Sequence, residues 1–110
     1  YDCLTQQILY YTTNATANFT INVRGNASTT LNSLMATGDA ITVVFMNTNG
    51  GTAYYANAFQ VDGASVTPKW QGGTAPSAGN ASSIDGYTFT IIKTSASPTY
   101  VMLGAITKYT

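Results

Sequence analysis

The chain has 110 residues with a formal net charge of zero, and only 7% of them are charged. It contains neither histidine nor glutamate, so the usual general base and the usual zinc ligand are both missing, and its four scattered cations do not form a basic patch for nucleic acid. No apolar run approaches the roughly 18 residues that a membrane span needs, so we expect neither a nucleic-acid nor a membrane partner.

Short strand-like segments make up most of the chain. In chain order they cover residues 3–11, 17–25, 40–47, 52–61, 64–70, 86–94 and 99–109. The second is the clearest, because Phe19, Ile21 and Val23 alternate with polar residues, as in a strand with one buried face. The third, 40–47, is apolar on both faces, which is typical of a central strand.

Turn signals separate these segments, and helical spacing is limited to one stretch. The apolar residues of that stretch and the stop that follows them are Leu31, Leu34, Met35 and Gly38. One or two helical turns are expected there. The NTNGG stretch at 47–51 and the Asp62-Gly63 pair accept positive φ at little cost, so both predict tight hairpin turns. Residues 71–83 lack apolar periodicity and are expected to be the longest loop.

This organisation predicts an all-β fold, either an antiparallel β-sandwich or a jelly-roll-like barrel with one short helical segment. The length suits a single domain over residues 1–110 with one modest core. The chain begins at Tyr1 rather than at a methionine, so we expect this domain to be the C-terminal part of a longer protein.

Several predicted strands keep apolar groups on both faces. In 99–109, Met102 and Ile106 face one way and Val101 and Leu103 the other. A two-layer sandwich buries only one face of each sheet, so the second set must meet solvent, a loop or another subunit. A subunit is favoured because one partner can bury many such groups together, and because a nearly uncharged surface repels its neighbours weakly.

The titratable residues form neither a catalytic nor a metal-binding pattern. Without histidine, a Ser-His-Asp or Cys-His arrangement cannot be built. The acidic residues are Asp2, Asp39, Asp62 and Asp85. Asp39 and Asp62 fit a loop and a turn, so the only conceivable catalytic pair of carboxylates is Asp2 with Asp85. None has the spacing of a calcium loop, and Cys3 has no partner for a disulfide within the chain. We therefore predict a protein that is not an enzyme, with no metal and no cofactor.

Three aromatic residues are the candidate ligand contacts, namely Tyr54, Tyr55 and Trp70. Their rings could stack on sugars, with Asn and Gln nearby to bind hydroxyl groups, so they predict a possible glycan or partner contact. The competing interpretation, which we favour, is that the two tyrosines pack within the fold.

The stretch VTPKWQGGTAP, residues 66–76, predicts a structural loop. Pro68 stiffens the approach to Trp70, and Gly72-Gly73 permits a turn that side chains would block. Trp70 is then expected to fold back over an open end of the sandwich as a plug on the core. A partner contact at Trp70 stays open as the alternative.

The chain also resembles a known family. The most specific segment is TPKWQGGTAP at 67–76, and further matching motifs are Leu4-Thr5-Gln6, Asn18-Phe19-Thr20, Arg24-Gly25, Thr30-Leu31-Asn32, Ala53-Tyr54-Tyr55, Val61-Asp62-Gly63, Ala78-Gly79-Asn80, Ile84-Asp85 and Tyr87-Thr88-Phe89. Over nearly its whole length the chain resembles a domain that recurs near the C-termini of virion structural proteins of marine tailed phages, especially cyanophages.

The resemblance implies a non-enzymatic component on the exposed surface of the virion, displayed on a tail fibre, on the tail or as a capsid decoration. It also implies self-association, with a homotrimer expected because phage fibres commonly use three-fold symmetry, and contact with other virion proteins. The alternative is a carbohydrate-binding adhesion module that attaches to a host surface glycan; the two roles are compatible, because a fibre tip can be both scaffold and receptor binder.

Overall fold

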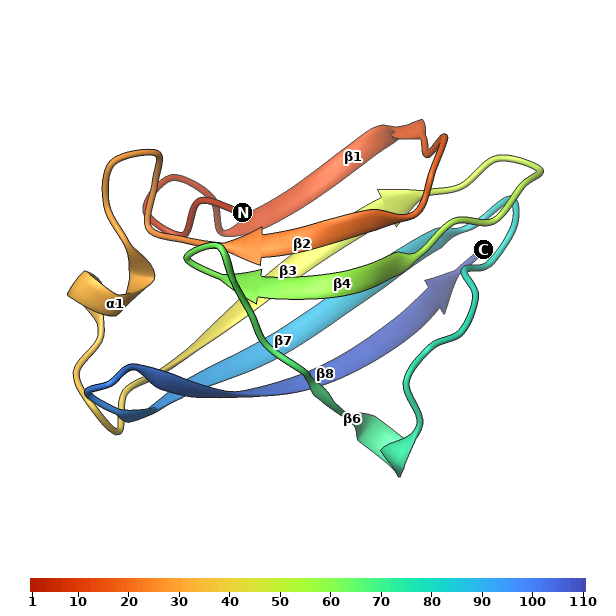
Figure 1. The fold of residues 1–110 in the computed structure, drawn as a ribbon. Coiled ribbons are helices and arrows are strands. Elements are labelled where there is room, and N and C mark those ends of the chain that lie inside the picture. The colour runs from red at the N-terminus through yellow and green to blue at the C-terminus, as the bar shows by residue number, and fades with distance from the viewer.

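A computed structural model describes all residues, 1–110, and shows two β-sheets packed face to face (Figure 1). The strands are β1 (Ile8–Asn14), β2 (Phe19–Val23), β3 (Ala40–Thr48), β4 (Ala56–Val61), β5 (Ala64–Ser65), β6 (Lys69–Trp70), β7 (Ile84–Ser95) and β8 (Thr99–Tyr109). One sheet has the order β1-β3-β7-β8-β6 and the other the order β2-β4-β5. A single helical turn, α1 (Leu31–Leu34), and a 3-10 turn, η1 (Gln71–Gly73), complete the fold. The predicted all-β sandwich with one short helical segment is confirmed.

Both sheets are mixed rather than antiparallel throughout. The pairs β1–β3, β2–β4 and β6–β8 are parallel, whereas β3–β7, β7–β8 and β4–β5 are antiparallel. Parallel neighbours cannot be joined by a tight hairpin and need a longer crossover. For β1–β3 and β2–β4 the chain makes that crossover by passing to the other sheet and back, as from β1 through β2 to β3, whereas β6 and β8 are connected through β7 of the same sheet.

The predicted hairpin at 47–51 is wrong. The strands on either side of it, β3 and β4, lie in different sheets, so this segment is a crossover between the two layers (Figure 1). The Asp62-Gly63 hairpin is confirmed: the two residues have φ of 52° and 80° and join β4 to β5.

The expected strand 64–70 is split, because β5 pairs with β4 whereas β6 pairs with β8 in the other sheet. Pro68, which has no N–H to donate, lies in the crossing between them.

The first strand begins later than predicted. Residues 3–5 form a turn instead, in which the backbone N–H groups of Thr5 and Gln6 both donate to the carbonyl of Asp2. The side chain of Gln6 returns to the Asp2 N–H at 2.8 Å, which closes the turn. The strand pattern was misleading here because local hydrogen bonds to the backbone compete with pairing in a sheet.

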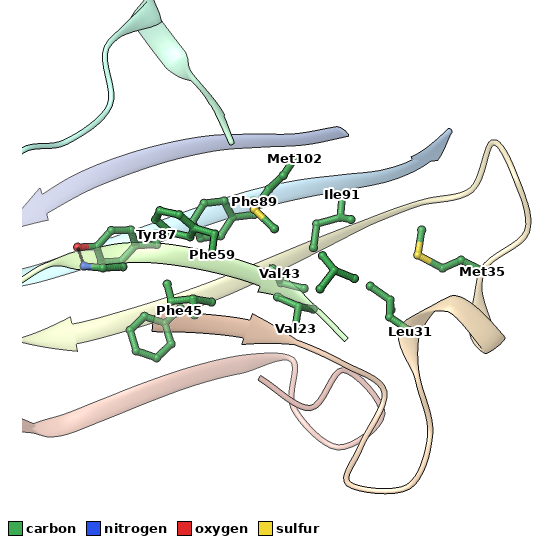
Figure 2. Close-up of a cluster of buried hydrophobic side chains, with 13 residues drawn as sticks. Val23, Leu31, Met35, Val43, Phe45, Phe59, Tyr87, Phe89, Ile91 and Met102 are labelled. Carbon is green, nitrogen blue, oxygen red and sulfur yellow. Dashed lines mark hydrogen bonds between the residues drawn. The ribbon is translucent and has the colours of Figure 1, made fainter. Parts of the chain in front are cut away.

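The core lies between the sheets and is built by alternation along the strands, with one irregularity on β4 where Asn57 and Ala58 both face outward. On β7, Tyr87, Phe89 and Ile91 are completely buried and the residues between them face away. Figure 2 shows Phe89 beside Phe59 of β4, and their ring centres are 5.4 Å apart. Each such side chain contributes about 1.5–3 kcal/mol by its burial, so this layer of side chains dominates the stability of the sandwich.

Candidate functional site

Trp70 closes one side of the sandwich. It lies on β6 at the edge of the five-stranded sheet, next to Gly104 of β8. The indole is half-buried, and its ring centre is 5.4 Å from that of Phe59 in the opposite sheet and 5.7 Å from that of Phe89 in its own sheet. The ring therefore bridges the two sheets at their edge rather than covering an end, and these contacts occupy much of its surface.

The loop around Trp70 depends on backbone conformation. Pro68 is half-buried before β6, and η1 follows Trp70 directly. Gly72 and Gly73 both have φ of 79°, a conformation that is strained for residues with a Cβ atom. Nothing lies within 4 Å of a Cβ built on either glycine, so the turn requires glycine for its backbone and not for close packing.

Tyr54 and Tyr55 lie in the crossover before β4 and not on a strand. Both are half-buried, and neither ring stacks on Trp70, so the structure does not bring the three candidate aromatic residues together as one platform. Side chains hold the backbone here. The Asn49 amide accepts from the Tyr54 N–H at 3.2 Å and donates to the Tyr54 carbonyl at 3.0 Å, and Asn18 Oδ1 accepts from the Tyr55 N–H at 3.1 Å.

Two of the four carboxylates have local roles. Arg24 Nε donates to Asp2 Oδ1 at 2.6 Å, and this hydrogen bond lowers the pKa of the Asp2 carboxyl. Asp39 Oδ2 accepts from the N–H of Ala36 in the loop after α1. Burial raises the pKa of the Cys3 thiol.

Asp62 and Lys93 together fasten α1 to the sandwich. The Asp62 carboxylate accepts from the backbone N–H groups of Leu31 and Asn32 at 2.6 and 2.9 Å. Lys93 is almost fully buried, and its ammonium donates to the carbonyls of Asn32 and Met35 at 3.3 and 2.8 Å. Unpaired groups at the two ends of a helical turn are thereby satisfied. Asp62 was predicted to form a turn, which it does, but its capping of α1 carries no signal in the sequence.

Asp85 is completely buried in a network of amides that sequence reasoning missed. Asn49 Nδ2 donates to Asp85 Oδ2 at 3.3 Å, and Asn80 donates to the same carboxylate from its backbone and from its side chain at 3.0 and 2.6 Å. Asn47 joins the network by donating from Nδ2 to Asn49 Oδ1 at 3.2 Å. Asp2 takes part in none of these contacts, and no group of three or more metal-ligating side chains is present.

The largest uncovered surface is the outer face of the five-stranded sheet, which we call the apolar outer face. The strand registers place these side chains on it: Ile8, Tyr10, Thr42, Val44, Met46, Thr88, Thr90, Ile92, Val101, Leu103 and Ala105. Of these, Ile8, Tyr10 and Leu103 are 59%, 45% and 44% exposed. No charged side chain stands on the outer side of β1, β3, β7 or β8, and only Lys69 borders the face from β6.

The outer face of the three-stranded sheet, here the polar outer face, has a different composition. Its side chains are Thr20, Asn22, Asn57, Ala58, Gln60 and Ser65. The spare apolar groups predicted from the sequence therefore gather on one side of the molecule and are not spread over both.

No protein-family model, curated protein or solved structure matches the chain. No helix of the fold is long and apolar enough to cross a membrane.

Proposed function

We propose that this chain is a non-enzymatic structural module of a phage virion, exposed on a fibre, on the tail or on the capsid surface, and that it works by self-association. The observation that carries the proposal is the apolar outer face, where Ile8, Tyr10 and Leu103 are exposed on one sheet surface whose only charged side chain is Lys69 at the β6 edge. The family resemblance of the 67–76 segment and of the motifs around it supports the setting in a virion.

The occupant of the apolar outer face is a further copy of the same chain. Four strands of about ten residues project to roughly 600 Å², and the accessible area of such a face is larger than its projection. A stable interface buries about 800 Å² on each partner, so the face is of the required size. The face carries one charged side chain, Lys69 at its β6 edge, so identical copies can meet over β1, β3, β7 and β8 without repulsion between like charges.

Three copies arranged around an axis, each with this face toward the axis, form the homotrimer that the resemblance implies. Such an arrangement leaves the polar outer face and the Trp70 loop at the periphery, where other virion proteins or a host surface contact them.

The alternative, a glycan-binding adhesion module built on Tyr54, Tyr55 and Trp70, has less support at those residues. Trp70 packs against Phe59 and Phe89, and the two tyrosines are half-buried in a separate crossover. Aromatic platforms for sugars need an exposed ring face.

Light scattering after size exclusion, over a range of protein concentrations, tests the proposal. The expected result is a stable mass of three chains. A stable dimer would retain the self-associating face but contradict the three-fold arrangement, and a monomer at the highest concentration would contradict the proposal as a whole.

A further inference from the structure

The two edge strands β1 and β2 lie beside each other on the side of the sandwich opposite Trp70 (Figure 1). Between them is a cleft of about 420 Å³, which we call the β1–β2 cleft. Ligand sites commonly have volumes of this order. The Trp70 side is bridged by an indole, whereas on this side Phe19 of β2 packs on Phe45 of β3 and both rings line the cleft.

Aromatic rings line the inner part of the cleft. Tyr11 and Phe19 both pack on Phe45, with ring centres 5.3 and 5.5 Å away. Tyr11 is nevertheless 53% exposed, and so part of its ring surface faces the solvent-filled cleft. An aromatic face backed by a rigid core is a suitable surface for stacking on the C–H groups of a ligand.

Asn47 adds a buried polar group to the lining. It is only 3% exposed, and its Nδ2 donates to Asn49 Oδ1. The orientation of Asn49 is fixed, since its Nδ2 donates to Asp85 and its Oδ1 accepts from the Tyr54 N–H. Asn47 must therefore turn Nδ2 toward Asn49, and its Oδ1 is left without a hydrogen bond inside the protein. This oxygen is not fully enclosed, so it can accept a hydrogen bond from water or from a ligand in the cleft.

The rim of the cleft is polar, and no charged side chain lines it. Its polar side chains are Thr13, Asn14, Thr16, Asn18, Thr20 and Asn22. These carboxamides and hydroxyl groups donate and accept hydrogen bonds without selecting for a charge. A charged ligand would lose hydration and find no oppositely charged side chain here, whereas the hydroxyl groups of a neutral ligand would find hydrogen-bond donors and acceptors.

We propose that the β1–β2 cleft binds a neutral saccharide. One sugar ring stacks on the exposed face of Tyr11, and one of its hydroxyl groups donates to Asn47 Oδ1. Asn49 and Asp85 are positioning residues, because they hold the Asn47 amide in the orientation that presents its oxygen. This site shares no residue with Tyr54, Tyr55 or Trp70, and it does not depend on the self-association proposed above.

Titration of the isotope-labelled protein with neutral sugars, followed by amide shifts in two-dimensional NMR, tests this proposal. The probes are glucose, galactose, mannose, N-acetylglucosamine and maltose, with glucuronic acid as the charged counterpart. At least one neutral sugar is expected to shift the resonances of Asn14, Asn18 and Asn47 with a Kd on the order of 1 mM, and glucuronic acid is expected to bind more weakly.

Matched variants show whether the sugar stacks on Tyr11 or binds to exposed tyrosine rings in general. Tyr11→Ala is expected to weaken binding about tenfold, and Asn47→Ala by a similar factor. Tyr10→Ala is the control, because Tyr10 is the neighbouring exposed tyrosine on the opposite face of β1. Tyr11 is exposed, so its variant should fold even where that of Asn47 does not.

The proposal is overturned if none of the neutral sugars shifts any resonance, if the shifts map to Trp70 and not to the cleft, or if Tyr11→Ala binds as well as the wild type. Repeating the titration on Leu103→Lys, which carries a charge on the apolar outer face, shows whether sugar binding persists when self-association is lost. Binding by that variant supports a cleft that acts on its own, and loss of binding by a folded variant contradicts it.

Discussion

The two outer faces of this sandwich carry different side chains. The apolar outer face exposes Ile8, Tyr10 and Leu103, whereas the polar outer face exposes amides and hydroxyl groups such as Asn57 and Thr20. Both sheets cover the same core with their inner sides, so folding requires apolar residues on neither outer face. Apolar groups collected on one outer face alone are therefore best explained by a contact outside the chain.

The largest expected effect is the difference in unfolding free energy between a substitution on the inner side of β7 and one on its outer side. Phe89→Ala removes a fully buried ring that contacts Phe59 and Trp70, and it should lower the free energy of unfolding by about 3–5 kcal/mol. Thr88→Ala, one residue away on the apolar outer face, should change it by less than about 0.5 kcal/mol in the monomer. Chemical denaturation of both variants measures the difference, and similar losses would contradict the assignment of the two sides.

The next effect concerns the buried amide network. Asp85→Ala leaves donors of Asn49 and Asn80 without an acceptor, and it should cost about 3 kcal/mol of unfolding free energy. Asn57→Ala on the polar outer face is the matched control and should be nearly neutral, because Asn57 is exposed. A loss below about 1 kcal/mol for Asp85→Ala would show that the network does not hold this end of the sandwich.

Alanine substitutions at two glycines, one on each side of the five-stranded sheet, should give a smaller difference in unfolding free energy. A Cβ at Gly104 would lie 2.9 Å from a Phe89 ring carbon and 3.1 Å from Trp70 Cε3, both inside the fold. A Cβ at Gly86 would lie 3.0 Å from the ring of Tyr109, which is exposed and free to move. Gly104→Ala should therefore cost about 1–3 kcal/mol and Gly86→Ala less than about 1 kcal/mol. Thermal and chemical unfolding measure both, and the reverse order would contradict the account.

The smallest effect is a dependence on alkaline pH. Burial raises the pKa of Tyr87 to about 12, while the unfolded chain releases this proton near its usual value of about 10. The unfolded state binds fewer protons between these values, so stability falls as pH rises from 10 toward 12, by about 1 kcal/mol between pH 10 and 11. Tyr87→Phe should remove that part of the decline relative to the wild type, although it also loses the acceptor for the Ala56 N–H. Identical pH slopes would count against the burial of this hydroxyl.

Most of the fold could be predicted from the sequence because apolar and polar residues alternate along its strands. The inward residues of β2 and β7 follow from a period of two, and so does the presence of a second apolar set on β8. The destination of the chain after β3 could not be predicted, because a turn-forming sequence such as 47–51 also suits a crossover between sheets. Local residue preferences do not say which sheet the next strand joins.

The candidate sites were less predictable than the strands. Pro68, Gly72 and Gly73 could be recognised as loop residues from their backbone preferences alone. Asp85 and Asn47 gave no signal, since Asn and Asp are common in turns, and their hydrogen bonds depend on segments that are distant in sequence. The β1–β2 cleft depends on which strands become edges, and this is decided by the pairing of the whole chain.

Sedimentation of the wild type and two charged variants over the same concentration range tests the central claim most directly. Leu103→Lys places one charge on the apolar outer face, and Asn57→Lys places the same charge on the polar outer face. The account predicts that the wild type and Asn57→Lys form trimers while Leu103→Lys, still folded, sediments as a monomer. The same assembly state for all three proteins would contradict the claim that the apolar outer face is where the copies of this chain meet.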